Sequence, residues 1–354
     1  MFENFSFTSY YVDKVIWKTL ENELENFHNI LIITGNKSFE SVKENILPIL
    51  KDKNIIIENY LGECCYEHSS TIIKNIIGKQ IDLILGIGGG KVIDTAKLVA
   101  NQINKTIFII PTIASTCAGT SALSVVYNQD KTFKEISFFK APPEKIFIDL
   151  ETIKKSPSRY TWAGIGDTLA KYYEVKIKHE YCLANNKKIN FPTQMAIELS
   201  HNCKNIIIKN SEDGYYSQEI NEAFKNIVLT IIVTTGMVSN FIDDFLNGAI
   251  AHSVFYGLTV LPRIEKEHLH GEVVAYGILV QLLLENNLEE YKKLTEFYKK
   301  LKFPINLTNI VRLEEFLEKE NDILEEILKG PDLIDFDFNI NKNNLKKALF
   351  YKNN

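Results

Sequence analysis

The stretch TIASTCAGTSALS, residues 112–124, concentrates residue types that contact small ligands. Hydroxyl groups and small side chains surround one cysteine, Cys117, and only Ile113 and Leu123 are large and apolar. Hydroxyls donate and accept hydrogen bonds readily, whereas a thiol does so weakly. We interpret the stretch as a ligand-facing loop, in which the cysteine is the residue that needs an explanation.

A glycine-rich turn, GIGGGKVIDTAK at residues 86–97, follows an apolar run and opens a helix-length segment. Glycines let a backbone approach a phosphate, and the unpaired N–H groups of a helix N-terminus favour anions. The turn fits neither common phosphate motif: Leu85 and Val92 break the Walker pattern, and Lys91 replaces the last glycine of GxGxxG. Taken alone, the turn is equally consistent with tight packing and with cofactor binding.

Three titratable residues of the second half stand in unusual surroundings. Asp167 follows two glycines at the start of an apolar helical segment. His252 lies among small residues of another helical segment, and His270 begins a third, just before Gly271. The histidines are 18 positions apart (270 − 252), which suits two successive helices joined by a turn.

The segments that must position these residues change in character along the chain. Up to about residue 150, apolar runs alternate with helix-length segments; the runs cover residues 30–35, 54–60, 81–90, 106–112 and 146–150. This alternation predicts βαβ units around a parallel sheet. Residues 124–139 instead suggest a β-hairpin with its turn near 128–131.

After residues 155–157 the apolar residues recur at helical spacing, as in segments 227–242, 249–261 and 272–285. We therefore predict a Rossmann-like α/β nucleotide-binding domain over residues 1–156 and an all-α domain over 157–354. The length of 354 residues agrees with two domains.

Composition excludes several classes of protein. A net charge of −5 gives no basic footprint for nucleic acid. The five scattered cysteines include no CxxC pair, so they indicate neither a disulfide framework nor a Cys-based zinc site. We find no signal peptide and no apolar run of the roughly 18–20 residues that a membrane helix needs. The expectation is a cytoplasmic protein that binds neither nucleic acid nor membranes.

Read together, the motifs resemble the glycerol dehydrogenase family, within the iron-containing alcohol dehydrogenase and dehydroquinate synthase-like superfamily. The collinear matches are GGGKVIDTAK, PTIASTCAGTSALSVVYN, AGIGDTLAKYYE, AHSVFYGLTVLP and HGEVVAYGILVQ. The resemblance implies that the glycine turn contacts the cofactor pyrophosphate through Gly89, Gly90, Lys91 and Asp94. It places these residues at the nicotinamide: Thr112, Ser115, Ser121, Leu123 and Tyr127.

Asn36 bears on the choice of cofactor. NAD-preferring relatives carry an acid just after the first strand, whereas this chain reads TGNK there. A carboxylate repels a 2′-phosphate and a neutral amide does not. We infer tolerance of NADP(H), with NAD(H) still open; Asn36 as a simple turn cap fits the sequence equally well.

The resemblance also implies that Asp167, His252 and His270 bind a metal ion. Two imidazoles and one carboxylate leave coordination positions open, as catalytic Zn²⁺ requires and as Fe²⁺ also accepts. Iron-using branches tend to have a further His where Lys171 stands, so zinc is favoured. The proton of the substrate hydroxyl would be transferred by His268 or by a chain of water molecules. Alternatively, His268 is only a solvated loop residue.

Cys117 departs from the glycerol dehydrogenases, which have an Asp at that place. It is either an inert packed residue, a sign of lost activity or a mark of a different substrate; we favour the last. Without the carboxylate, a 2-hydroxy or 2-oxo acid becomes acceptable, and the loop looks closest to the hydroxycarboxylate dehydrogenase branch. Phe255 replaces a second family histidine and predicts a more apolar pocket. Arg263 and Lys266 are candidate cations for the substrate, or else parts of a solvated loop.

The prediction is thus a metal-dependent NAD(P)(H) oxidoreductase that interconverts a secondary alcohol and a ketone. Its small-molecule substrate would be a hydroxy or oxo acid or a glycerol-like polyol, and the protein would form homo-oligomers as its relatives do. Glycerol dehydrogenase proper is the alternative. A non-catalytic nucleotide-binding relative and a dehydroquinate synthase-like lyase fit less well.

Overall fold

The computed structural model describes residues 7–13, 16–130 and 132–351. These residues divide into two compact units. The first, here the α/β unit, comprises the described residues up to Ser158 together with Ile231–Asn240. The second, here the helical unit, comprises Arg159–Thr230 and the described residues from Phe241 onward. Residues 231–240 were predicted in the all-α domain; they are helical, but they group with the α/β unit.

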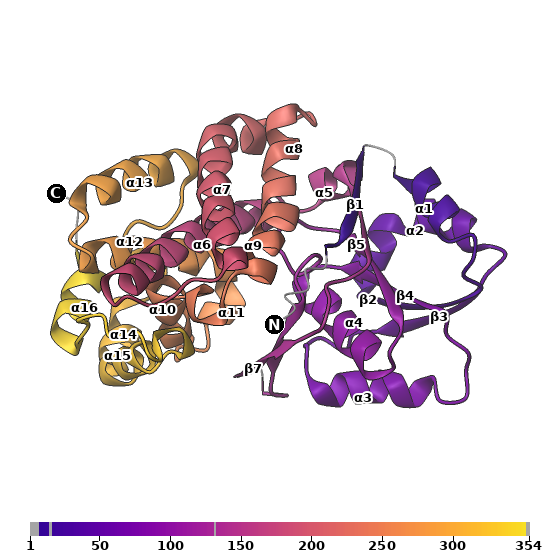
Figure 1. The fold of residues 1–354 in the computed structure, drawn as a ribbon, viewed down its shortest axis with the longest axis horizontal. Coiled ribbons are helices and arrows are strands. Elements are labelled where there is room, and N and C mark those ends of the chain that lie inside the picture. Colours follow the sequence, from indigo (N-terminus) through magenta and orange to yellow (C-terminus); the bar gives the residue numbers. More distant parts are fainter. Residues whose placement is uncertain (1–6, 14–15, 131, 352–354) are drawn as a thin grey trace. The chain divides into compact units, whose positions relative to one another are not determined.

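The α/β unit is built on a six-stranded sheet in which all neighbouring strands run parallel (Figure 1). In spatial order the strands are β1 (Ser9–Asp13), β8 (Lys145–Asp149), β5 (Thr106–Pro111), β4 (Leu83–Gly88), β2 (Asn29–Thr34) and β3 (Asn54–Asn59). The central strands are runs of buried Ile and Leu because helices cover both faces of the sheet. This confirms the predicted parallel α/β fold and adds β1, a polar edge strand that the sequence did not reveal.

Helices lie on both faces of this sheet. The helices of the unit are α1 (Trp17–Glu23), α2 (Asn36–Leu50), α3 (Tyr66–Asn75), α4 (Gly90–Gln102), α5 (Leu150–Lys155) and most of α9 (Thr235–Phe241). One buried cluster joins α1 and α2 to alternate residues of β4, among them Leu83 and Leu85. The opposite face meets α4, where Gly86 lies beside Ala96.

A separate antiparallel hairpin pairs β6 (Leu123–Tyr127) with β7 (Phe133–Phe138), as the sequence predicted. Ser124 lies opposite Ser137, and the register shifts between Val126 and Tyr127. Of the turn predicted near residues 128–131, position 131 lies outside the described residues.

The helical unit contains no strand among its described residues, which confirms the helical prediction for the second half. Its helices are α6 (Arg159–Ala184), α7 (Phe191–Tyr216), α8 (Glu222–Leu229), α10 (Ile250–Leu258), α11 (Ile264–Glu267), α12 (His270–Leu284), α13 (Leu288–Leu301), α14 (Leu313–Glu318), α15 (Glu320–Leu328) and α16 (Lys342–Leu349). Single turns complete the chain: the π turn η1 (Thr230–Thr234) and the 3₁₀ turns η2 (Asp244–Leu246), η3 (Leu307–Asn309) and η4 (Pro331–Leu333).

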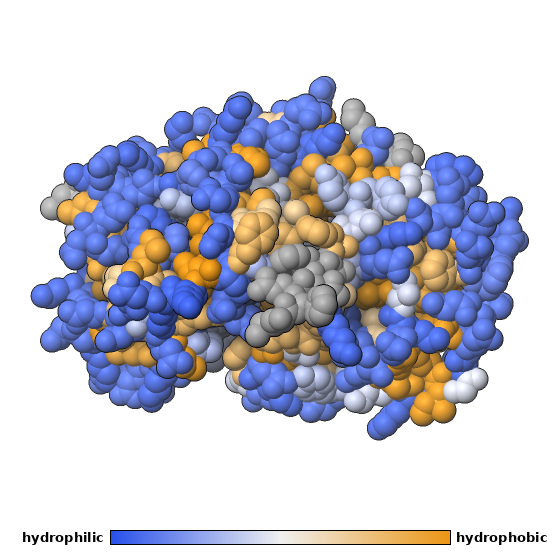
Figure 2. All heavy atoms as spheres, in the orientation of Figure 1, coloured by the Kyte–Doolittle hydropathy of each residue, from blue (hydrophilic) through white to orange (hydrophobic). Residues whose placement is uncertain are grey.

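One helical run corrects an expectation about membranes. Glu222–Phe241, which joins α8, η1 and α9, is by length and composition apolar enough to cross a membrane. Its apolar window is 61% buried inside the protein, as in the core helix of a soluble protein. On the face drawn in Figure 2, hydrophilic residues cover most of the surface and apolar residues show between them in small groups.

Candidate active site

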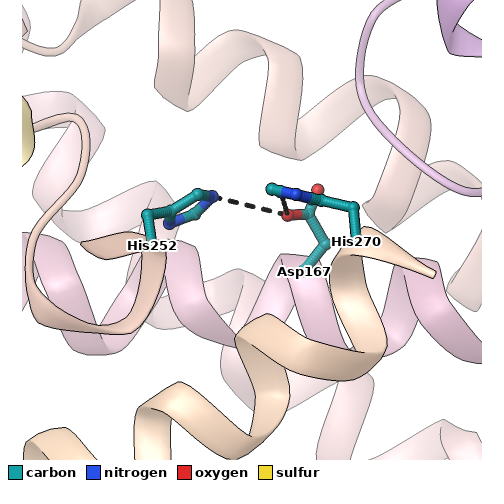
Figure 3. Close-up of side chains that lie close together, drawn as sticks. All are labelled: Asp167, His252 and His270. Atoms are coloured by element: carbon teal, nitrogen blue, oxygen red, sulfur yellow. Dashed lines mark ion pairs between the residues drawn. The ribbon is translucent and has the colours of Figure 1, made fainter. Parts of the chain in front are cut away.

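Asp167, His252 and His270 converge from three helices of the helical unit (Figure 3). Asp167 belongs to α6 and His252 to α10, while His270 is the first residue of α12. Oδ1 of Asp167 lies 3.7 Å from Nε2 of His252 and 3.3 Å from Nε2 of His270. One potential ligand atom from each side chain lies within 4.8 Å of the others, and no second such group occurs in the described part of the chain.

Small residues allow the three helices to approach this closely. A Cβ on Gly271 would collide with the carbonyl of Ala163 on α6, and one on Gly166 would collide with the carbonyl of Gly271. Further along α12, a Cβ on Gly277 would collide with the carbonyl of Ala251 on α10. Gly271, next to His270, therefore serves packing, because α6 fills the space beside it.

Glu174 supports the triad from behind and was not singled out from the sequence. Its side chain is fully buried, and one oxygen accepts the backbone N–H groups of Ala249 and His252, each at 2.9 Å. The other oxygen lies 2.6 Å from Nδ1 of His252. Because an ionised carboxylate only accepts hydrogen bonds, Nδ1 donates and Nε2 is left facing Asp167. The sequence feature that could have pointed to Glu174 is its position two helical turns after Asp167, as a carboxylate in an apolar helix.

The charges of this cluster stabilise one another. Burial opposes ionisation of Asp167 and Glu174, but the neighbouring imidazoles and their hydrogen bonds hold the pKa of each carboxyl below its usual range. Burial also opposes the charged form of His252, yet Glu174 and Asp167 raise its pKa to about 10. A metal ion bound here would replace the extra proton of His252, because an imidazole binds a metal only in its neutral form.

Two aromatic rings border His270. Phe255 meets it edge to face, with ring centroids 4.4 Å apart, and the ring of His252 lies 5.2 Å away. His268, the predicted proton relay, lies just before α12, with its Nδ1 2.8 Å from Oε1 of Glu272. Oε2 of Glu272 also accepts the backbone N–H of Leu269, so the helix N-terminus holds His268 in one orientation.

Lys171 and Arg263, two cations near the predicted site in the sequence, are both bound by other residues of the protein. Lys171, at the place of a possible fourth ligand, donates to the backbone and side-chain oxygens of Asn247 at 2.9 and 2.8 Å. Arg263 pairs with Glu267 at 2.5 Å and lies 3.7 Å from Glu315. Arg263 is therefore held by two acids, which argues against its role as a free cation for a substrate.

In the α/β unit, three of the predicted cofactor residues follow the carboxyl ends of parallel strands: Asn36 after β2, Gly89 after β4 and Thr112 after β5. From β2 the chain proceeds to β3 on one side, and from β4 it proceeds to β5 on the other. The strand order therefore reverses between β2 and β4, the position where open α/β sheets bind ligands. Helix α2 begins there at Asn36 and α4 at Gly90. Asn36 is exposed and accepts a hydrogen bond of 3.1 Å from Asn59.

The glycines of the turn also serve packing. A Cβ on Gly89 would meet Ile113 at 2.6 Å, and one on Gly90 would meet the Thr116 hydroxyl at 3.1 Å. The backbone N–H of Thr112 donates to the carbonyl of Gly88 at 3.1 Å. The loop and the glycine turn are thus packed together, which supports the packing alternative, and cofactor binding by the turn stays a prediction.

Lys91 and Asp94 have different surroundings. The Lys91 ammonium is half-exposed, lies 2.6 Å from buried Glu63 and 5.1 Å from the ring centre of Tyr127. Two predicted cofactor residues, Lys91 and Tyr127, therefore lie together. Asp94 is buried instead, 2.9 Å from the Lys97 ammonium, and accepts the N–H of Val125 at 3.3 Å. These contacts tie α4 to β6, so direct contact of Asp94 with a cofactor stays a prediction.

Lys97 organises the loop and was also missed. Its buried ammonium donates to the carbonyls of Ala118, at 2.7 Å, Ser121 and Leu123. Desolvating an ammonium is costly, so several acceptors are needed to compensate it. The sequence feature that could have pointed to Lys97 is the occurrence of a lysine among the apolar residues of α4. Ser115 and Cys117 are half-buried on this loop, whereas Ser121 is almost fully buried.

Comparisons with known proteins identify the family. The model of the iron-containing alcohol dehydrogenase family matches residues 8–149. Hydroxycarboxylate dehydrogenase A of Escherichia coli is 34% identical over 236 residues, which are 66% of this chain and 64% of that protein. The glycerol dehydrogenase of Thermotoga maritima is 31% identical over 312 residues, 82% of this chain and 80% of that one.

A solved structure agrees over almost the whole length. The crystal structure of a probable glycerol dehydrogenase from Sinorhizobium meliloti superposes with a TM-score of 0.85 at 25% identity, and the match covers 98% of this chain and 97% of that one. Sequence and fold thus point to the same relatives, as the motifs predicted. The chain belongs to the iron-containing alcohol dehydrogenase family and is an oxidoreductase.

Proposed function

We propose that this protein transfers hydride between a nicotinamide cofactor and a small secondary alcohol or ketone, at a metal held by Asp167, His252 and His270. The observation that carries the proposal is the convergence of these side chains, backed by Glu174. A buried carboxylate that orients a metal-binding imidazole is the usual support of such sites. A packing role alone would not require three titratable side chains to face one another.

The donor set fits a catalytic divalent cation. Two imidazole nitrogens and one carboxylate leave positions free for a substrate oxygen, as in catalytic zinc sites. Lys171 stands where iron-using relatives tend to have a further His, and its ammonium has no lone pair for a metal. Its hydrogen bonds to Asn247 hold it as a cation, so the missing fourth ligand favours Zn²⁺ over Fe²⁺. When bound, the metal supplies Lewis-acid polarisation of the substrate oxygen and lowers the pKa of an alcohol.

The surrounding residues orient and protect the reacting groups. Glu174 keeps His252 in the tautomer whose Nε2 faces the site. Phe255 packs against His270 and gives this side an apolar wall. His268, with Glu272 holding its Nδ1, leaves Nε2 to carry a proton to or from the substrate oxygen.

For the cofactor we propose that both NAD(H) and NADP(H) are accepted. Asn36 and Lys37 begin α2, which follows β2 where the strand order reverses between β2 and β4, and both are exposed. A neutral amide, a cation and a helix N-terminus tolerate a 2′-phosphate, which a carboxylate would repel. The measurement is the ratio of kcat/KM for NADPH and NADH; a preference for NADH of more than about a hundredfold would contradict it.

For the substrate we propose a small 2-oxo or 2-hydroxy acid, with glycerol-like polyols as the alternative. Cys117 brings no charge to the place where glycerol dehydrogenases have an acid, and the hydroxycarboxylate dehydrogenase of Escherichia coli is similar in sequence. Since acids hold Arg263, the proposal rests on the lost repulsion at Cys117 and not on a gained cation.

The test uses purified protein with Zn²⁺ and each nicotinamide cofactor. NAD(P)H absorbance should fall with 2-oxobutyrate or 2-oxoglutarate and rise more weakly with NAD(P)⁺ and glycerol. Cys117→Asp should shift kcat/KM from oxo acids toward glycerol by about tenfold or more, whereas the neutral control Cys117→Ser should not. Bound metal without turnover of any oxo acid, polyol or aldehyde would favour a non-catalytic binding protein.

We further propose a soluble, cytoplasmic homo-oligomer that acts on small molecules without nucleic acid or membrane partners. The support is the family, the net charge of −5 and the burial of the apolar run Glu222–Phe241. Light scattering coupled to size exclusion measures the assembly directly, and a mass near 40.6 kDa would contradict it.

A further inference from the structure

The ligand-facing loop is held from a second side by α9. The amide of Asn240 donates to the carbonyl of Thr120 at 2.8 Å and accepts the backbone N–H of Ala122 at 2.7 Å. One side chain thus satisfies a donor and an acceptor of the loop backbone. Such a pair of contacts fixes both the distance and the orientation of the loop, because both groups must be met at once.

The contact continues to the π turn. The Thr120 hydroxyl donates to the carbonyl of Ile232, within η1. A π turn changes the pairing of helix carbonyls, and such turns often occur at functional sites. One turn further on, a Cβ on Gly236 would collide with the Thr120 hydroxyl, so the helix backbone lies directly against the loop.

This packing brings a further side chain to the cysteine. Ser239, next to Asn240, has its hydroxyl 3.9 Å from Sγ of Cys117. All these residues belong to the α/β unit, to which 231–240 is contributed by the second half of the chain. Lys97 of α4 also donates to loop carbonyls, so α4 and α9 each hold the loop through side-chain hydrogen bonds.

We propose that Asn240 is a positioning residue for hydride transfer, because it sets where the loop from Cys117 to Leu123 meets the nicotinamide. The inference rests on the proposed function, which assigns the nicotinamide to this loop. Small displacements of a reacting group lower the rate steeply, since catalysis depends on alignment of the reactants. Asn240 acts through the loop and needs no contact with substrate.

The test compares Asn240→Ala with Asn287→Ala. Asn287 is also half-buried and also meets a backbone N–H, that of Glu290, but it caps α13 in the helical unit. Asn240→Ala should raise the Kd of NADH about tenfold and lower kcat at least as much. The Kd of ADP-ribose, which lacks nicotinamide, should change little. Asn287→Ala should change none of the three. Equal weakening of NADH and ADP-ribose, or unchanged kcat, would overturn the proposal.

Thr120→Val and Thr120→Ser give a second, independent comparison. The valine removes the hydroxyl that meets Ile232, whereas the serine keeps it, so only the valine variant should lower kcat. If both variants keep the kcat of the unaltered protein, the π turn has no positioning role.

Hydrogen exchange of the loop can test the role of Asn240 even if the proposed function is wrong, because it needs no bound cofactor. Asn240→Ala should speed amide exchange in a peptide spanning 118–124, because Ala122 loses its acceptor. If the unaltered protein binds neither NADH nor ADP-ribose, the proposed function has failed, yet exchange still reports on the loop. Unchanged exchange would show that Asn240 does not hold the loop and would overturn the proposal.

Discussion

Among the residues of the site, Glu174 supports the candidate metal ligands without being one of them. It touches no reacting group, yet it accepts the ring proton of His252 and two backbone N–H groups at the start of α10. A buried carboxylate in this position fixes the ring, its tautomer and the beginning of the helix together. Loss of Glu174 should therefore affect the metal before it affects the fold.

Glu174→Gln should lower the affinity for Zn²⁺ by about 10–100-fold, because the amide no longer supplies the charge that makes His252 a better ligand. Metal retained after dialysis against a graded chelator measures the effect. Glu285→Gln is the control, since Glu285 is also a largely buried helix carboxylate, with a side chain 10% exposed, but contacts Gln281 and Lys176 instead. Equal zinc affinity in all three proteins would remove Glu174 from the metal site.

The raised pKa of His252 predicts how the metal-free protein responds to pH. The pKa is about 10 in the folded chain and 6.5 in the unfolded chain. Since the folded pKa is the higher one, the stabilisation is complete below pH 6.5 and is lost as the pH rises through 10. With a chelator present, the unfolding free energy should fall over this range.

Denaturant titrations at several pH values measure this trend. The variant His252→Gln should show a flatter profile, because it lacks the group that titrates. Zinc binding to the unaltered protein should release a proton and strengthen as the pH rises, since the imidazole must be neutral to bind a metal. A zinc affinity independent of pH would contradict the assignment of His252 as a ligand.

At the scale of elements, backbone approach decides where the candidate ligands meet. Helix α12 lies against α6 and α10 through positions that admit no side chain, among them Gly271 and Gly277. His270 begins α12 beside Gly271, so the position of its ring depends on how closely the helices pack. In the α/β unit, Lys97 and Asn240 position the ligand-facing loop through hydrogen bonds to its backbone.

Gly271→Ala should displace the start of α12 and cost about 1–3 kcal/mol of stability through overpacking. It should also lower zinc stoichiometry and kcat, because His270 moves with the helix. Gly214→Ala is the control: its Cβ would meet Ile227 at 2.6 Å in the contact between α7 and α8. That variant should lose similar stability but keep its zinc; zinc retained by both variants would contradict this account of the packing.

For the whole molecule, the residues predicted to bind the metal ion and those predicted to bind the cofactor belong to different units. The metal residues lie on α6, α10 and α12 of the helical unit, and the predicted cofactor residues lie in the α/β unit. Binding protects the elements that carry the contacts, because local opening must then also release the ligand. Each ligand should therefore leave its own pattern of hydrogen exchange.

Zinc should slow amide exchange in residues 159–184, 250–258 and 270–284 and leave the sheet unchanged. ADP-ribose should slow exchange at the start of α2 and α4 and leave those three helices unchanged. Exchange measured by mass spectrometry with each ligand alone tests both statements. Zinc protection confined to the α/β unit would refute the metal assignment.

The sequence by itself determined the class of fold and the family. Runs of Ile and Leu between helix-length segments predicted the parallel strands, because strands covered on both faces must be apolar throughout. The resemblance named Asp167, His252 and His270 as metal residues, and the structure brings these three together. Such patterns are local in the chain, so they can be read without knowing what packs against them.

Only the tertiary structure decided which residues support the site. Glu174 and Lys97 look like ordinary helix charges in the sequence, and their roles appear when His252 and the loop carbonyls lie beside them. Asn240 meets a loop some 120 residues away, within a segment grouped with the other half of the chain. The physical reason is that a buried polar group is defined by its partner, and partners distant in the sequence meet only in the folded chain.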